Sequence, residues 1–258
     1  MAVEIEKALK YPLNFKPLFM LGMLFFIVLI SLFIPSIFFS KDVLTGTASD
    51  GIFSLIILYS IFFVTTLVLL FTFFNGYMVS VSRSIVAGNN TKAPEIKDIV
   101  RIFIDGIKYE VISLVYTIVP VLFLILAVMT TYLLIAAVFR PLAEGITILM
   151  GFLYLFLLYP LFFVFHIAGA HFVRTGSVRK ALNIPYIYSL VFGNIKAYTI
   201  DFFIYFIVTL VYSIAIMVLV TYPFVLVASY VAGQYIFTMF YLESTGFIAE
   251  PEKPAAPS

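Results

Sequence analysis

The chain has 258 residues, of which 64% are hydrophobic and 11% are charged. A soluble domain carries about 25% charged residues, so this composition excludes a chain that hides its apolar side chains in one aqueous core. The formal net charge of +2 gives no reason to expect a nucleic acid partner, and the absence of cysteine excludes disulfides, thiol nucleophiles and thiolate metal sites. The sequence therefore predicts an all-α integral membrane protein whose main partner is the lipid bilayer.

Long uncharged runs divide the chain into predicted spans, because about 20 helical residues cross a hydrocarbon core. We predict a cytoplasmic amphipathic lead-in over residues 1–17, a six-helix transmembrane domain over residues 18–243 and a disordered cytoplasmic tail over residues 244–258. The six spans are placed at about 18–40, 52–76, 111–138, 145–172, 198–220 and 223–243. The last two share one run of 41 uncharged residues, about twice the length of a single crossing.

The sequence also predicts one kink within a span and one tight turn between two spans. Pro120 in the third predicted span should kink the helix, because proline cannot donate a backbone hydrogen bond and its ring crowds the preceding turn. Arg140, Pro141 and Glu144 should form the tight turn between the third and fourth spans.

The segment before the third span has the pattern of an amphipathic helix. Pro94 stands where a helix can begin, and Glu95 and Asp98 fall in its first turn, where the helix dipole favours negative charge. The apolar residues that follow at helical spacing are Ile96, Ile99, Val100, Phe103 and Ile107, and those of the polar face are Lys97, Arg101, Asp105 and Lys108. We predict that this helix lies in the bilayer interface and leads directly into the third span, and that a second interfacial helix precedes the fifth span.

Lysine and arginine are divided unequally between the two predicted sides of the membrane. An even number of spans places both termini on the same side, together with the loops near residues 83–109 and 174–200. Thirteen of the 15 Lys and Arg residues fall on that side, which the positive-inside rule assigns to the cytoplasm. We therefore predict a multi-pass protein of the cell (plasma) membrane with cytoplasmic termini.

Some of these basic residues are also candidates for contacts with anionic lipid headgroups. The candidates are Arg83, Lys97, Arg101, Lys108, Arg174, Arg179, Lys180 and Lys196. The alternative is that they only set the topology, because the same rule expects basic residues there in any protein of this kind.

Residues 102–118 and 190–206 resemble each other. Each contains Ile-Lys, at Ile107-Lys108 and at Ile195-Lys196, followed by a span that bears tyrosines. The unit of span, loop with interfacial helix, and span would cross the membrane twice in the same sense, which is a parallel internal repeat of the kind found in some transporters. The alternative is that interfacial helices leading into spans resemble one another because they meet the same environment.

Several short pieces of the chain form a recognisable set. They are Tyr11-Pro12, Gly76-Tyr77, Arg83, Pro94-Glu95, Asp98, Phe103, Asp105-Gly106-Ile107-Lys108 and Val115-Tyr116. This set resembles the archaeal membrane family called domain of unknown function 4013, over roughly residues 7–243 and most specifically over Gly76–Tyr116. The family often carries Arg where this chain has Ser80 and Leu where it has Ala93. The resemblance implies an archaeal plasma membrane protein and supplies no catalytic residues.

A few polar residues fall within the predicted spans. Asn75, His166 and Gln234 form a candidate intramembrane polar site, although each is also explained as a partner in a hydrogen bond between helices. His166 and His171 are turned about 140° apart around a helix and have no visible third ligand, so we predict no metal site. We also predict no cofactor.

Three functions are consistent with the sequence. We expect a non-enzymatic helical bundle that organises lipids or accompanies another membrane protein complex, because the known catalytic and nucleotide-binding motifs are absent. One alternative is a small transporter built on the repeat, with Asn75, Pro120, His166 and Gln234 along its path. The other is a membrane-embedded lipid-modifying enzyme, whose candidate acidic residues are Asp105, Glu110 and Asp201.

Overall fold

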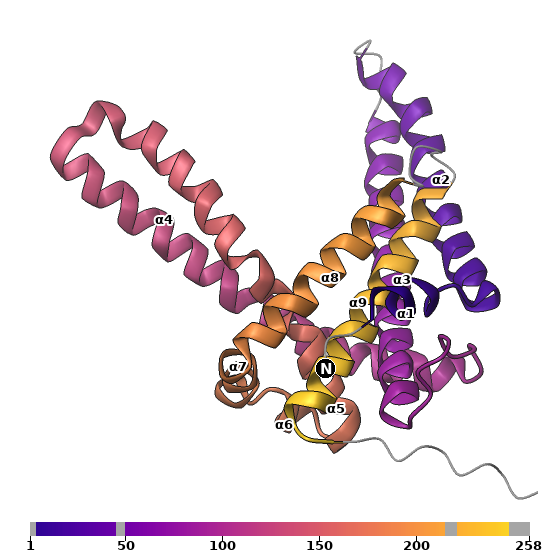
Figure 1. Cartoon of the computed structure of the whole chain (residues 1–258). Helices are drawn as coiled ribbons and strands as arrows, with labels where there is room; N and C mark the ends of the chain where they lie inside the picture. Colours follow the sequence, from indigo (N-terminus) through magenta and orange to yellow (C-terminus); the bar gives the residue numbers. More distant parts are fainter. Residues whose placement is uncertain (1–3, 45–49, 215–220, 248–258) are drawn as a thin grey trace, which may run out of the picture.

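The computed structural model describes residues 4–44, 50–214 and 221–247, which are helical apart from short turns and the loop over residues 87–98 (Figure 1). The elements are α1 Ile5–Lys10, α2 Phe15–Leu44, α3 Asp50–Val86, α4 Ile99–Leu158, the 3-10 helix η1 Tyr159–Phe163, α5 Val164–Thr175, α6 Val178–Ala181, α7 Ile184–Gly193, α8 Ile195–Ile214 and α9 Tyr222–Ser244. The described residues contain no strand, which confirms the predicted all-α class.

Four helical stretches among the described residues are long and apolar enough to cross a membrane. They are Ser54–Val86, Ile99–Thr175, Ile195–Ile214 and Tyr222–Ser244. The described apolar part of α2, Lys16–Val28, is shorter. The predicted spans all lie within helices, except that residues 215–220 of the fifth span lie outside the described residues. The predicted disordered tail covers residues 244–258, but Ser244 is the last residue of α9, and the backbone N–H groups of Thr245, Gly246 and Phe247 bond back to carbonyls of α9. Residues 248–258 lie outside the described residues.

The stretch Ile99–Thr175 is a hairpin rather than one straight helix. Its 77 residues include Phe139, whose backbone angles of φ −152° and ψ 83° are not helical. Figure 1 shows α4 reversing direction and extending two antiparallel arms away from the other helices. Pro120 keeps helical backbone angles, so the break in α4 comes at Phe139, immediately before the predicted turn residues Arg140 and Pro141.

The central helix of the bundle is α9. Helices α2, α3, α5 and α8 all pack against it, and Figure 1 shows α9 between α3 and α8. In the most apolar 18-residue stretch of α9, 83% of the residues are buried within the protein. The corresponding shares are only 11% for Ser54–Val86, 17% for Ile99–Thr175 and 33% for Ile195–Ile214. Because other helices cover most of α9, its polar side chains can be buried without facing hydrocarbon.

Helices α3 and α4 approach each other backbone to backbone at two glycines. A Cβ atom added at Gly106 would lie 1.9 Å from the carbonyl oxygen of Thr72, and one added at Gly76 would lie 1.7 Å from the carbonyl oxygen of Ile102. Small residues permit this kind of close crossing between membrane helices. The crossing turns one face of α4 toward the bundle, and its buried residues there are Ile102, Asp105, Gly106, Tyr109, Ile112, Tyr116 and Pro120.

The helix predicted to start at Pro94 begins instead at Ile99. Asp98 is its N-cap, and the Asp98 carboxylate accepts a hydrogen bond from the backbone N–H of Arg101 at 3.0 Å. Residues 94–97 are not helical, and the hydroxyl of Tyr77 donates to the carbonyl of Pro94 at 2.9 Å. An aspartate that satisfies the first free N–H groups is a stronger start signal than a proline whose carbonyl is already bonded elsewhere.

The N-terminal segment packs onto the bundle. Tyr11 is fully buried, and its ring stacks on Tyr235 of α9 with the ring centres 4.4 Å apart. The backbone N–H of Ala93 donates to the carbonyl of Tyr11 at 3.0 Å, and the hydroxyl of Tyr212 donates to the carbonyl of Leu9 at 2.5 Å. The predicted lead-in is therefore tied to α8, to α9 and to the loop before α4.

The two segments of the predicted repeat are packed differently. Lys108 lies in the third turn of α4, whereas Lys196 is the second residue of α8. Helix α3 packs directly on α4, whereas α5 and α8 both pack on α9. Before α8, the chain forms the short apolar helix α7, which has Pro185 in its first turn and Asn183 as N-cap. The repeat stays a prediction.

Candidate functional site: a buried polar cluster and a basic group

A buried polar cluster joins four helices. It consists of Ser82 from α3, Tyr109 from α4, His166 from α5, and Gln234 and Thr238 from α9, each at most 1% exposed. We call these five residues the polar cluster.

Gln234 stands at the centre of the polar cluster. Its Oε1 accepts hydrogen bonds from the hydroxyl of Tyr109 at 2.8 Å and from Nδ1 of His166 at 2.6 Å. Its Nε2 donates to Oγ of Ser82 at 2.5 Å, and Oγ of Ser82 lies 2.9 Å from Oγ1 of Thr238. Because an amide oxygen only accepts, this arrangement requires the proton of a neutral His166 to be on Nδ1.

Aromatic rings enclose His166. The ring centre of Phe165 lies 4.0 Å from that of the imidazole, and Phe237 lies nearly parallel to it at 5.5 Å. On α9, Gly233 leaves room for this packing, since a Cβ atom there would lie 2.9 Å from the Tyr205 ring and 3.5 Å from Nε2 of His166. The polar cluster is therefore surrounded by protein on the side of the imidazole.

The structure brings together two of the three residues of the predicted intramembrane polar site. His166 and Gln234 are in direct contact, as described above. Asn75 is half-buried on α3, and none of the cluster's hydrogen bonds among the described residues involves it. Sequence reasoning missed Ser82, Tyr109 and Thr238. The position of Thr238 one turn after Gln234 was the available signal for one of them.

The two histidines have separate partners. Nδ1 of His171 lies 2.9 Å from the hydroxyl of Tyr241, well apart from the hydrogen bonds of His166. In the part of the chain that the structure describes, no three His, Cys, Asp or Glu side chains are grouped so as to hold a metal ion. The chemistry that the polar cluster offers is neutral hydrogen bonding between helices.

A second arrangement surrounds Asp105 at the first turns of α4. The sequence predicted Asp105 on an exposed polar face, and this prediction is wrong, since the residue is only 6% exposed. NH2 of Arg83 donates to Oδ2 of Asp105 at 2.8 Å, while Nε of Arg101 and Nζ of Lys108 lie 3.9 and 4.0 Å from its carboxylate oxygens. The error arose because helical spacing within α4 cannot reveal a partner on α3. We call Arg83, Arg101, Asp105 and Lys108 the basic group.

The other predicted headgroup residues lie in the last turn of α5, in α6, in the first turn of α8 and, for Lys97, just before the N-cap of α4. These helix ends lie on the same side of the bundle (Figure 1). Lys97, Arg174, Arg179, Lys180 and Lys196 are all exposed. The guanidinium of Arg174 lies over the rings of Tyr241 and Phe247, at 5.9 and 4.7 Å from their centres, and NH1 donates to the Tyr241 hydroxyl at 3.4 Å.

The three acidic residues weighed as catalytic candidates are not gathered in one place. Asp105 is paired with Arg83, and the carboxylate of Glu110 accepts a hydrogen bond from the Thr72 hydroxyl at 2.8 Å. Asp201 is buried on another helix, α8.

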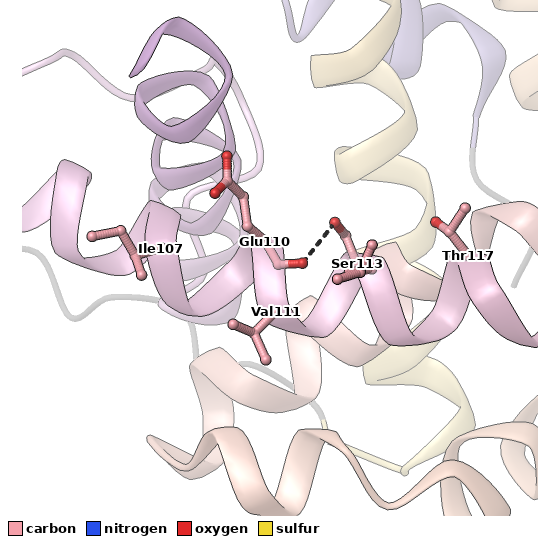
Figure 2. A pocket seen from close by; sticks show the side chains of 6 residues that line it. Ile107, Glu110, Val111, Ser113 and Thr117 are labelled. Carbon is pink, nitrogen blue, oxygen red and sulfur yellow. Dashed lines mark hydrogen bonds between the residues drawn. The ribbon is translucent and has the colours of Figure 1, made fainter. Parts of the chain in front are cut away.

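An open hollow of about 470 Å³ runs along the outer face of α4 (Figure 2). Its lining residues are Ile107, Glu110, Val111, Ser113, Leu114 and Thr117. Figure 2 shows the Glu110 side chain directed toward α3, in agreement with its bond to Thr72, and the Ser113 hydroxyl bonded to the Glu110 carbonyl at 3.2 Å. The remaining surface of the hollow is largely apolar.

Residues 60–225 match the family model described as protein of unknown function (DUF4013). This match covers more than half of the chain. The chain belongs to the DUF4013 family. No curated protein and no solved structure matches it.

The matched range contains all of the basic group of this DUF4013 protein but only part of its polar cluster. All four residues of the basic group fall within it, as do Ser82, Tyr109 and His166 of the polar cluster. Gln234 and Thr238 lie beyond its end, on α9. The central helix of the bundle is therefore mostly outside the matched range.

Proposed function

We propose that this DUF4013 protein is a non-enzymatic helical bundle of the plasma membrane that organises anionic lipids or accompanies another membrane protein complex. It crosses the membrane six times, through α2, α3, the two arms of the α4 hairpin with η1 and α5, α8 and α9, and its termini are cytoplasmic. The first turns of α4 lie at the cytoplasmic interface. The resemblance noted above supports an archaeal origin.

The observation that carries this proposal is that the side chains of the polar cluster form hydrogen bonds with one another. Its polar side chains bond to one another across four helices, and aromatic rings pack around His166. Polar groups used in this way hold helices together. The scattered acidic residues support the absence of an enzymatic site.

The distribution of basic residues supports the topology. The ends of α3, α5 and α9, the starts of α4 and α8, and α6 lie on one side of the bundle, and the bend of α4 lies at the far end of the hairpin (Figure 1). The first turns of α4 also carry exposed apolar side chains beside their charges, as an interfacial helix requires. Those side chains are Ile99, Val100, Ile104 and Ile107.

Purification in mild detergent tests the proposal. Mass spectrometry of the purified protein should detect retained anionic phospholipids or a retained membrane protein. Reconstitution into liposomes should show no flux across a broad panel of solutes. Solute uptake together with an absence of bound lipid and protein would contradict the proposed role.

A small transporter is the second candidate, because His166 is an ionisable residue buried where four helices meet. A transporter would show solute uptake in liposomes that His166→Ala abolishes. Ser113→Ala is a matched control, since its hydroxyl bonds only to a carbonyl of its own helix.

A further inference from the structure

We propose that the basic group and the adjoining hollow of α4 together bind one anionic phospholipid, with its phosphate at Arg101 and Lys108 and an acyl chain in the hollow. This inference rests on the proposed function and names the residues that perform it.

The first support is an excess of positive charge at one point. Three cationic side chains converge on the single carboxylate of Asp105, which leaves a net charge of +2 at the basic group. Only Arg83 is hydrogen-bonded to Asp105, because 3.9 and 4.0 Å are too long for a hydrogen bond. The donors of Arg101 and Lys108 therefore remain free for an anion.

The second support is that the side chains of Arg101 and Lys108 are exposed to a ligand while that of Asp105 is buried. The side chains of Arg101 and Lys108 are 61% and 46% exposed, whereas that of Asp105 is 9% exposed beneath them. Asp105 thus holds Arg83 by a hydrogen bond and draws the other two cations together, while their outer surfaces stay accessible. Guanidinium and ammonium groups are the usual partners of phosphate oxygens.

The third support separates a lipid from a free phosphate. The hollow extends along α4 from Ile107 to Thr117, about 15 Å along the helix axis at 1.5 Å per residue. Lys108 adjoins its rim at Val111, because residues three positions apart are neighbours on a helix surface. Ile107, Val111 and Leu114 are 53%, 46% and 61% exposed there. A free phosphate has no use for this apolar surface, whereas the acyl chain of a lipid held at Lys108 would cover it.

Binding of phosphatidylglycerol to detergent-purified protein, followed by native mass spectrometry, tests the site. Arg101→Gln with Lys108→Gln should weaken binding by roughly 30-fold, from the usual contribution of each basic residue near an anionic surface. Arg179→Gln with Lys180→Gln removes the same residue types and charge from α6 and should weaken binding by no more than a few-fold. Leu114→Trp, which fills the hollow from an exposed position, should weaken it several-fold.

The controls separate the possible failures. An equal loss in both double variants would overturn the site in favour of diffuse surface charge. Displacement of the lipid by millimolar inorganic phosphate, with no effect of Leu114→Trp, would overturn the assignment to a lipid. If the wild-type protein retains phosphatidylglycerol but Arg101→Gln with Lys108→Gln does not change its affinity, only this site fails. If the wild-type protein retains no anionic lipid, the proposed lipid role itself fails. Size-exclusion chromatography checks that each variant is folded.

Discussion

Replacing Gly106 by alanine tests the close crossing of α3 and α4. Alanine is a better helix former than glycine by about 1 kcal/mol, so helix propensity alone favours the variant. The added Cβ atom, however, would lie 1.9 Å from the carbonyl oxygen of Thr72. Carbon atoms approach carbonyl oxygens in helix interfaces to about 3.3 Å, so the two backbones must separate by about 1.4 Å.

This separation strains the two bonds that connect α3 to α4 nearby. They are the bond from Thr72 to Glu110 and the bond from Arg83 to Asp105, both 2.8 Å long. Overpacking costs about 1–3 kcal/mol and each weakened bond costs about 1 kcal/mol, against a propensity gain of about 1 kcal/mol. The free energy of unfolding should therefore fall by about 2–4 kcal/mol.

Thermal unfolding in mild detergent, followed by circular dichroism, measures this effect. The Tm of Gly106→Ala should fall by roughly 5–15 °C, using the usual relation between stability and Tm for chains of this size. Gly145→Ala is the control, because no atom lies within 4 Å of its added Cβ, and its Tm should stay the same or rise slightly. Equal Tm values for the two variants would refute the backbone contact.

Three further predictions concern the polar cluster, the N-terminal segment and the topology. Gln234→Leu leaves Tyr109 and His166 without their shared acceptor and should lower the free energy of unfolding by about 1–3 kcal/mol, whereas Ser113→Ala should change it by less than about 0.5 kcal/mol; equal thermal stabilities would contradict the role of Gln234. Tyr11→Ala should cost about 3 kcal/mol in the same thermal assay through loss of its buried ring, while Leu13→Ala, at a side chain 56% exposed, should have little effect, and a reversed order would show that α1 is not docked. Because the chain lacks cysteine, a cysteine at Asn89 should be labelled only from the cytoplasm and one at Gly145 only from outside, and reversed labelling in intact cells would overturn the topology.

Patterns in the sequence predicted the structure correctly where a segment's own residues determine its conformation. A run of uncharged residues is helical in a bilayer whatever its neighbours, because every backbone polar group must be bonded within the segment. The predicted spans accordingly lie within helices. The start of α4 shows the limit of such reasoning, since Pro94 and Asp98 both suggest a helix start and the hydrogen bond from Tyr77 to Pro94 comes from another helix.

The polar cluster was partly predictable. A histidine and a glutamine within apolar runs are unusual enough to be noticed, and the structure places His166 and Gln234 in contact. Ser82 and Thr238 are ordinary residues in their own segments, and their hydroxyls meet across 156 positions of sequence. No periodicity in either helix identifies such a pair.

The apolar composition and its long uncharged runs by themselves determined that this chain is an all-helical membrane protein, because only lipid can solvate so much hydrocarbon and runs of this length cross it as helices. Which helix lies at the centre was decided only by tertiary structure. Helix α9 qualifies as a span by length and composition as the other three stretches do, yet it alone of the four candidate spans is mostly covered by its neighbours. The same packing buried Asp105 beneath three cations, because the glycines that bring two backbones together act between segments, and a linear pattern carries no record of which surfaces meet.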